Sequence, residues 1–144
     1  MPSAAVPRPL VTRLRPLILG GTAAYWLLML VLTHIPEIPK DYEPGVGDKW
    51  EHRIGYFLLA LGLSLSLSAW KGRLRFGRLA LIFGVIAISG AFDETTQPFF
   101  GRECDWYDWL ADLQGGAAGV LMGLAIDRAA RTLRGDWFPG SHDD

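Results

Sequence analysis

The chain has 144 residues, half of them hydrophobic, and a formal net charge of −1. That length fits one domain, and the near-neutral charge gives no reason to expect nucleic acid as a partner. The single cysteine, Cys104, excludes an intramolecular disulfide, and no Cys/His spacing resembles a zinc site. The apolar residues come in blocks long enough to cross a bilayer, which excludes a water-soluble core fold and predicts an all-α integral membrane protein.

The first 16 residues precede an uncharged run that can form a transmembrane helix. Four prolines lie among the arginines of residues 1–16, so we expect an irregular cytoplasmic tail there. A helix is predicted over about 17–33. Basic residues before such a run are also typical of a signal peptide, but Thr33 to Glu37 contain no small-x-small cleavage site. The run is therefore interpreted as an uncleaved first span.

Three further apolar runs complete a bundle of four transmembrane helices. We predict these helices over about 53–71, 76–94 and 107–127. A basic turn from Lys71 to Arg78 separates the second and third runs, and residues 127–144 form a cytoplasmic C-terminal tail. Residues 17–126 are thus expected to form one transmembrane domain between two short tails.

Lysine and arginine are distributed unevenly among the connections. Ten of them flank the spans in the N-terminal tail, in the basic turn and in the first part of the C-terminal tail. The two other connections, residues 33–53 and 93–108, hold only four. Because basic residues favour the cytoplasmic side of a membrane, both termini are predicted to be cytoplasmic, with the two acidic connections outside.

Acidic residues lie at membrane depth near the outer ends of the third and fourth helices. The third uncharged run is shorter than the about 20 residues that cross a bilayer, which places Asp93 and Glu94 near the hydrocarbon boundary. Asp112 lies one turn inside the fourth run. Charged groups at this depth are costly against lipid, so an intramembrane acid favours a functional role.

The spacing of the polar residues predicts that three segments direct ionisable groups to one outer mouth. Asp105, Asp108 and Asp112 are three and four apart, so a helix carries them on one side. The spacing of four recurs before the second span and after the third. The candidate ligand-binding residues of this mouth are Asp48, Lys49, His52, Tyr56, Asp93, Glu94, Gln97, Arg102, Asp105, Asp108 and Asp112. The alternative is a buried network of ion pairs that only holds the bundle together.

Two motifs in these segments resemble those of the VanZ-like family of bacterial membrane proteins, over about residues 30–126. The first is similar to Asp-Lys-x-x-His-x-x-x-Tyr and consists of Asp48, Lys49, His52 and Tyr56. The second consists of Asp93, Glu94, Gln97, Phe99, Gly101, Arg102, Asp108, Gly115 and Gly119. Asp112 stands where the family often has asparagine, which adds a possible charge.

The resemblance implies a cell-envelope role in the bacterial plasma (inner) membrane and no particular reaction; the family's namesake is linked to resistance against the glycopeptide teicoplanin. We expect a non-enzymatic protein that binds a lipid-linked cell-wall intermediate or a lipid-tailed glycopeptide at the outer leaflet. A phosphate of the ligand could be bound by Lys49, Arg53 and Arg102. The carboxylates could accept hydrogen bonds from its sugar or amine groups.

An enzyme is the first alternative. Clustered carboxylates with one histidine could hold Mg²⁺, Mn²⁺ or Ca²⁺, and a metal-bound water could then hydrolyse a lipid phosphate or ester. His52 could instead act with Asp48 as a general base, so the candidate catalytic residues are His52, Asp48, Asp105 and Asp108. Apart from that possible divalent metal, no cofactor is predicted. The second alternative is a small proton-linked carrier that uses Asp112.

Three glycines, Gly115, Gly119 and Gly123, recur every four positions along one face of the fourth helix. Small residues at this spacing let helix backbones approach closely in lipid, so packing within the bundle is their expected role. The same face could also pair two copies of the chain into a homodimer. Membrane lipids are the other expected partners.

Overall fold

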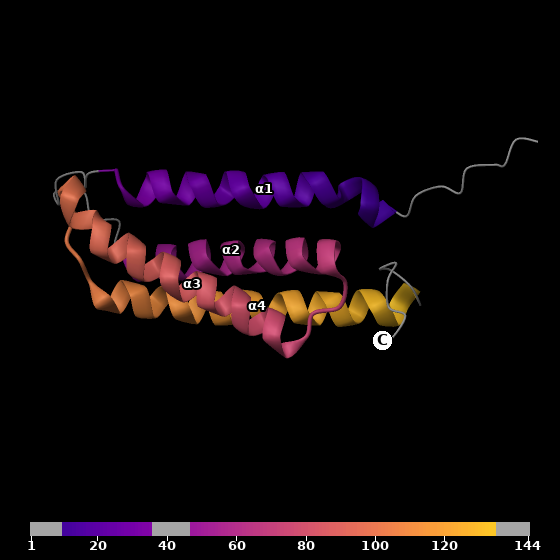
Figure 1. Cartoon of the computed structure of the whole chain (residues 1–144). Helices are drawn as coiled ribbons and strands as arrows, with labels where there is room; N and C mark the ends of the chain where they lie inside the picture. Colours follow the sequence, from indigo (N-terminus) through magenta and orange to yellow (C-terminus); the bar gives the residue numbers. More distant parts are fainter. Residues whose placement is uncertain (1–9, 36–46, 135–144) are drawn as a thin grey trace, which may run out of the picture.

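The computed structural model describes residues 10–35 and 47–134. Within them the elements are α1 (Leu10–Thr33), α2 (Asp48–Lys71), α3 (Phe76–Thr96), the short 3-10 helix η1 (Gln97–Phe100) and α4 (Trp106–Arg134) (Figure 1). All four α-helices are long and apolar enough to cross a membrane, and the described residues contain no strand. The predicted all-α bundle of a multi-pass membrane protein is thereby confirmed.

Helix α1 begins before the first apolar run. It starts at Leu10 rather than near residue 17, so part of the predicted irregular tail is helical and Pro16 lies inside the helix. The residues that precede Pro16 are mostly leucine and arginine, which favour helices. The remainder of that tail, residues 1–9, lies outside the described part of the chain.

Helices α2 and α4 also extend beyond their apolar runs. Helix α2 begins at Asp48, one turn before the predicted start, and α4 continues to Arg134. Both extensions are rich in charged residues, which can form regular helix without contact with lipid. Hydropathy alone marks the membrane-crossing part of a helix, so it misses such ends. Residues 135–144 lie outside the described part.

The closest helix pair is α2 with α4, and glycines make the approach possible. A Cβ atom at Gly115 or Gly119 would collide with the backbone carbonyl of Arg53 or Phe57, and one at Gly123 would collide with Ser64. The glycines therefore serve packing within one chain, as small residues do in membrane helices. A second copy could reach this face only if α2 moved away from it.

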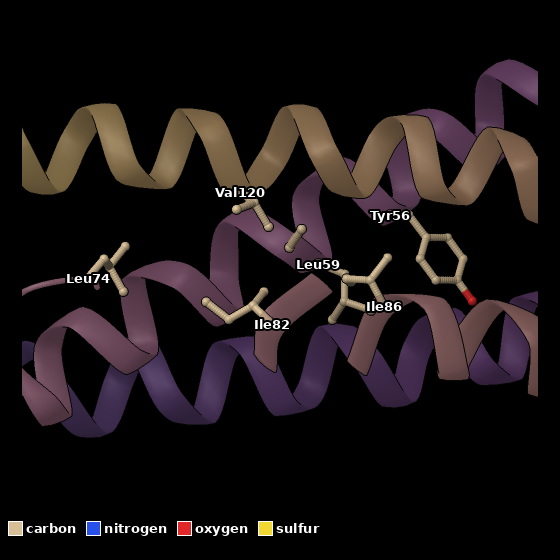
Figure 2. Packing of buried hydrophobic residues seen from close by; sticks show 7 residues of the cluster. Tyr56, Leu59, Leu74, Ile82, Ile86 and Val120 are labelled. Atoms are coloured by element: carbon tan, nitrogen blue, oxygen red, sulfur yellow. The ribbon is translucent and has the colours of Figure 1, made fainter. Parts of the chain in front are cut away.

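A small apolar cluster fills the space between α2, α3 and α4. Figure 2 shows Leu59, Ile82, Ile86 and Val120 between these helices, with the hydroxyl of Tyr56 pointing away from them. Leu59 and Ile86 are completely buried. Helix α1 packs against α2, where the Thr22 hydroxyl lies 3.0 Å from that of Ser66.

The two ends of the bundle differ in character. The first turns of α1, the α2–α3 connection and the end of α4 lie towards the same end (Figure 1). There the buried Asp127 accepts hydrogen bonds from the Ser68 hydroxyl, from the Leu74 N–H at 3.2 Å and from Arg131. Asp127 thus fastens the α2–α3 connection to α4, a role that its position after the fourth apolar run did not reveal.

At the opposite end, α1 and α3 finish while α2 and α4 begin (Figure 1). We call this the acidic end, and five of its described carboxylates matter below: Asp93, Glu94, Asp105, Asp108 and Asp112. Four of the five are buried, with Asp105 the exception. Buried acids at the end of a membrane bundle require partners, and their contacts decide what this end can do.

Candidate functional site

A lysine joins two of the carboxylates at the acidic end. The Nζ atom of Lys49, in the first turn of α2, lies 2.9 Å from Oδ2 of Asp105 and 2.9 Å from Oδ1 of Asp108. The side chains of Lys49 and Asp105 are partly exposed, whereas that of Asp108 is almost completely covered. Lys49 therefore supplies the positive charge that the predicted row of carboxylates on α4 requires, and it fixes the start of α2 against the start of α4.

Asp105 also caps α4 and connects it to α3. Its Oδ1 accepts a hydrogen bond of 2.8 Å from the N–H of Tyr107, in the first turn of the helix. Its own N–H donates to Oε2 of Glu94 at 2.9 Å. The bond from Lys49, followed by that from Tyr107, lowers the pKa of the Asp105 carboxyl below its ordinary value. Asp105 is thus a charged junction between three helices.

A buried histidine–aspartate pair lies deeper in the bundle. Nδ1 of His52 on α2 is 2.8 Å from Oδ1 of Asp112 on α4. Asp112 is fully buried, and its Oδ2 has no hydrogen-bond partner among the described residues. A Cβ atom at Gly90 would lie 2.8 Å from that oxygen, so α3 approaches the pair at a position without a side chain. When the Nδ1 proton is donated to Asp112, Nε2 carries the lone pair of the ring.

A third carboxylate, that of Glu94, completes a compact group with His52 and Asp108. Glu94 is fully buried at the end of α3. Its Oε2 holds the Asp105 N–H, while its Oε1 has no hydrogen-bond partner in the described part of the chain. One ligand atom from each of His52, Glu94 and Asp108 lies within 4.8 Å of the other two. The group combines one imidazole with two carboxylates, a donor set that suits a divalent metal.

Two residues at the end of α1 belong to the acidic end although the sequence did not suggest them. The hydroxyl of Thr33 donates to Oδ1 of Asp93 at 2.8 Å, and Nδ1 of His34 lies 3.5 Å from the same oxygen. The other ring nitrogen of His34 is 2.8 Å from the Thr96 hydroxyl. In the sequence, His34 stands near Pro36 after an apolar run, a position that suggests only a loop residue.

The remaining predicted residues belong to segments at the same end. Nη1 of Arg102 lies 3.3 Å from the backbone carbonyl oxygen of Thr33, and Gln97 is buried at the start of η1. Arg53 donates a hydrogen bond of 2.9 Å from Nε to Oε1 of Gln114 on α4. The side chain of Asp48 lies outside the described part of the structure.

A cleft of about 380 Å³ opens between α1 and α2 beside this cluster. Three of its apolar residues, Leu28, Leu32 and Ile54, are more than half exposed, so the cleft faces the region that lipid occupies around the bundle. The cleft is lined by Tyr25, Leu28, Met29, Leu32, Thr33, Glu51, His52, Ile54, Gly55, Tyr56 and Arg102. It therefore combines an apolar wall with polar groups from the acidic end.

Comparison with models of known protein families gave no match. Comparisons with curated proteins and with solved structures also gave none. The function must therefore be inferred from the four membrane-crossing helices, the acidic end and the cleft.

Proposed function

We propose that the protein binds an anionic amphiphile in the cleft between α1 and α2, at the outer leaflet of the bacterial plasma membrane, without breaking a bond. A lipid-linked cell-wall intermediate or a lipid-tailed glycopeptide would be such a ligand, in keeping with the resemblance to VanZ-like proteins. The observation that carries the proposal is the composition of the cleft, in which lipid-facing apolar residues and Arg102 line one space.

The two parts of the cleft match the two parts of an amphiphile. Leu28, Leu32 and Ile54 offer an apolar surface on which a hydrocarbon chain can lie. The guanidinium of Arg102 suits a phosphate or carboxylate, because its N–H groups can donate two parallel hydrogen bonds. The Thr33 side chain lines the same space and adds a hydroxyl. A volume of about 380 Å³ falls within the range of small-molecule sites.

The distribution of charge supports the proposed orientation. The basic connections of the sequence belong to the end of the bundle opposite the acidic end, as the two ends of Figure 1 illustrate. By the positive-inside rule the acidic end then faces outward, with both termini in the cytoplasm. Alkaline phosphatase is active only outside the cytoplasm, so its fusion to the end of α4 tests this orientation. We expect the fused enzyme to be inactive.

Native mass spectrometry of the purified chain with a polyprenyl phosphate tests the binding itself. Arg102→Ala should weaken binding at least tenfold, since it removes the cation that lines the cleft. Arg128→Ala is the matched control, because Arg128 is an exposed arginine near the far end of α4. Equal binding by the wild type and the Arg102 variant would contradict the proposal.

A second pair of variants tests the place where the hydrocarbon chain lies. Ile54→Trp should fill the cleft and weaken binding of the same polyprenyl phosphate, because Ile54 is one of its lining residues. Leu121→Trp adds the same bulk to an exposed position of α4 outside the cleft and should leave binding unchanged. Parallel weakening by both substitutions would indicate a nonspecific effect of tryptophan.

Hydrolysis of a lipid phosphate or ester is a second candidate function, favoured by the His52–Asp112 pair. An imidazole held by a buried carboxylate can act as a general base towards water. Release of inorganic phosphate from a polyprenyl phosphate, lost in His52→Gln, would support an enzyme; binding without turnover would support the simpler proposal.

A further inference from the structure

We propose that His52, Glu94 and Asp108 bind one divalent cation of the Mn²⁺ or Zn²⁺ class at the acidic end. Each residue comes from a different helix, α2, α3 and α4, and all three are buried. The site would therefore hold together the three helices that enclose the apolar cluster. It is separate from the Arg102 contact on which the amphiphile proposal rests.

The distances between the three donor groups are compatible with a shared ion. Because the donor atoms lie within 4.8 Å of one another, a central ion would be no more than about 2.8 Å from each, close to the roughly 2.0–2.2 Å of bound Zn²⁺. Small rotations of the side chains cover the difference.

The unpartnered oxygen of Glu94 is an independent indication of a ligand. Glu94 is fully buried, and its Oε1 has no hydrogen-bond partner among the described residues, while Oε2 is held by the Asp105 N–H. A buried carboxylate oxygen without a partner costs on the order of 1–3 kcal/mol or more. A cation at the centre of the three residues would provide the missing contact.

The surroundings of His52 match those of a metal ligand. Histidines that bind metals commonly donate their second ring N–H to a carboxylate, which fixes the tautomer and the orientation of the ring. Asp112 is placed to accept that bond from Nδ1 at 2.8 Å. The other nitrogen, Nε2, would then bind the cation, and Asp112 would act as a positioning residue.

The charge balance at the acidic end also favours a cation. Four carboxylates are buried there: Asp93 lies 3.5 Å from His34, Asp108 bonds Lys49 and Asp112 bonds His52, while Glu94 accepts from a backbone N–H. Like charges in a poorly hydrated space repel one another strongly. Lys49 binds one oxygen of Asp108, Oδ1, so the second carboxylate oxygen can turn to the ion.

The donor set selects the class of metal. One imidazole and two carboxylates suit Mn²⁺ or Zn²⁺ better than Ca²⁺ or Mg²⁺, which prefer oxygen ligands throughout. Three protein ligands leave at least one coordination position for water or for an anionic group. His52 also lines the cleft, so a phosphate in the cleft could approach the ion; this last step rests on the proposed function.

Titration of the chelator-treated, purified full chain with Mn²⁺ alone, followed by electron paramagnetic resonance, tests the site. We expect one Mn²⁺ per chain, displaced by Zn²⁺, and an affinity at least tenfold lower in Glu94→Gln. Glu103→Gln is the matched control, because Glu103 is an exposed acid in the neighbouring α3–α4 connection, and its affinity should equal that of the wild type. Absence of saturable binding by the wild type, or equal affinity in Glu94→Gln, would overturn the proposal.

Two further measurements make the result specific. Asp108→Asn, on a different helix, should weaken Mn²⁺ binding as well, and circular dichroism of each variant establishes whether it remains folded. If both ligand variants lose helical structure, the number of Mn²⁺ ions bound per wild-type chain still decides whether the site exists. A chelator-treated protein that binds a polyprenyl phosphate but no Mn²⁺ would refute the metal site alone, whereas Mn²⁺ binding without amphiphile binding would refute only the proposed function.

Discussion

Nδ1 of His52 lies 2.8 Å from Oδ1 of Asp112, and this contact joins two buried side chains of α2 and α4. Both residues belong to helices that cross the membrane. Replacing both partners of such a pair by apolar residues changes the stability of the fold little. Replacing one partner leaves the other buried without a hydrogen bond, which destabilises the fold. Substitutions of Asp112 separate these effects.

Asp112→Asn and Asp112→Ala should therefore differ. Asparagine retains an oxygen that can accept from Nδ1 of His52 and removes a buried charge, so its thermal midpoint should equal or exceed that of the wild type. Alanine removes the acceptor and should destabilise the fold by about 1–3 kcal/mol. Thermal unfolding in detergent, followed by circular dichroism, measures both. Equal midpoints for the two variants would mean that the hydrogen bond contributes nothing.

The glycine contact between α2 and α4 makes a second prediction. Gly119→Ala places a methyl group against the backbone of Phe57 and should cost about 1–3 kcal/mol through overpacking. Gly84→Ala is the control, since a Cβ there meets no atom within 4 Å and alanine favours the helix. The Gly119 variant should unfold at a lower temperature than the wild type and the Gly84 variant should not. A stable Gly119 variant would contradict the close α2–α4 packing.

The hydrogen bond that Thr33 donates to Asp93 leads to a third prediction. Thr33→Val keeps the shape of the side chain but removes the donor to a buried carboxylate, so we expect a loss of about 1–3 kcal/mol. Thr95→Val is the control, because the exposed hydroxyl of Thr95 bonds only backbone carbonyls of its own helix in the described structure. Similar thermal midpoints for both variants would show that α1 is not held to α3 by this bond.

A fourth prediction concerns pH. Because the fold lowers the pKa of Asp105, its stabilising contribution is complete above its ordinary pKa of about 3.9 and is lost as the pH falls through the lower value of the folded state. Asp105→Asn can still cap α4 but cannot attract Lys49. The wild type should unfold at a higher temperature than this variant at pH 7, and the difference should shrink below about pH 4. A difference that is independent of pH would exclude the charge as its source.

The sequence predicts the four membrane-crossing helices because hydropathy is a local property. Each apolar run is long enough to reveal its own helix, and the spacing of Asp108 and Asp112 reveals their shared face without knowledge of the partner helix. The ends of the helices are harder to predict. Helix α1, for example, begins at Leu10, before Pro16 and before the apolar run.

Contacts between distant residues could not be predicted in the same way. Thr33 and Asp93 are 60 residues apart, and no local spacing connects them. The bond between Arg53 and Gln114, 61 residues apart, also depends on how α2 crosses α4. The cleft likewise results from the relative placement of α1 and α2, which is a property of the packed bundle rather than of either helix.

The position of the cleft on the side of the bundle has a consequence for how a ligand arrives. Its mouth lies beside Leu28, Leu32 and Ile54 rather than on the axis of the helices. An amphiphile already dissolved in one leaflet would reach it by diffusing in the plane of the membrane, in two dimensions. Occupancy would then depend on the number of ligand molecules per unit area of that leaflet, and dilution of the surrounding aqueous phase would leave it unchanged.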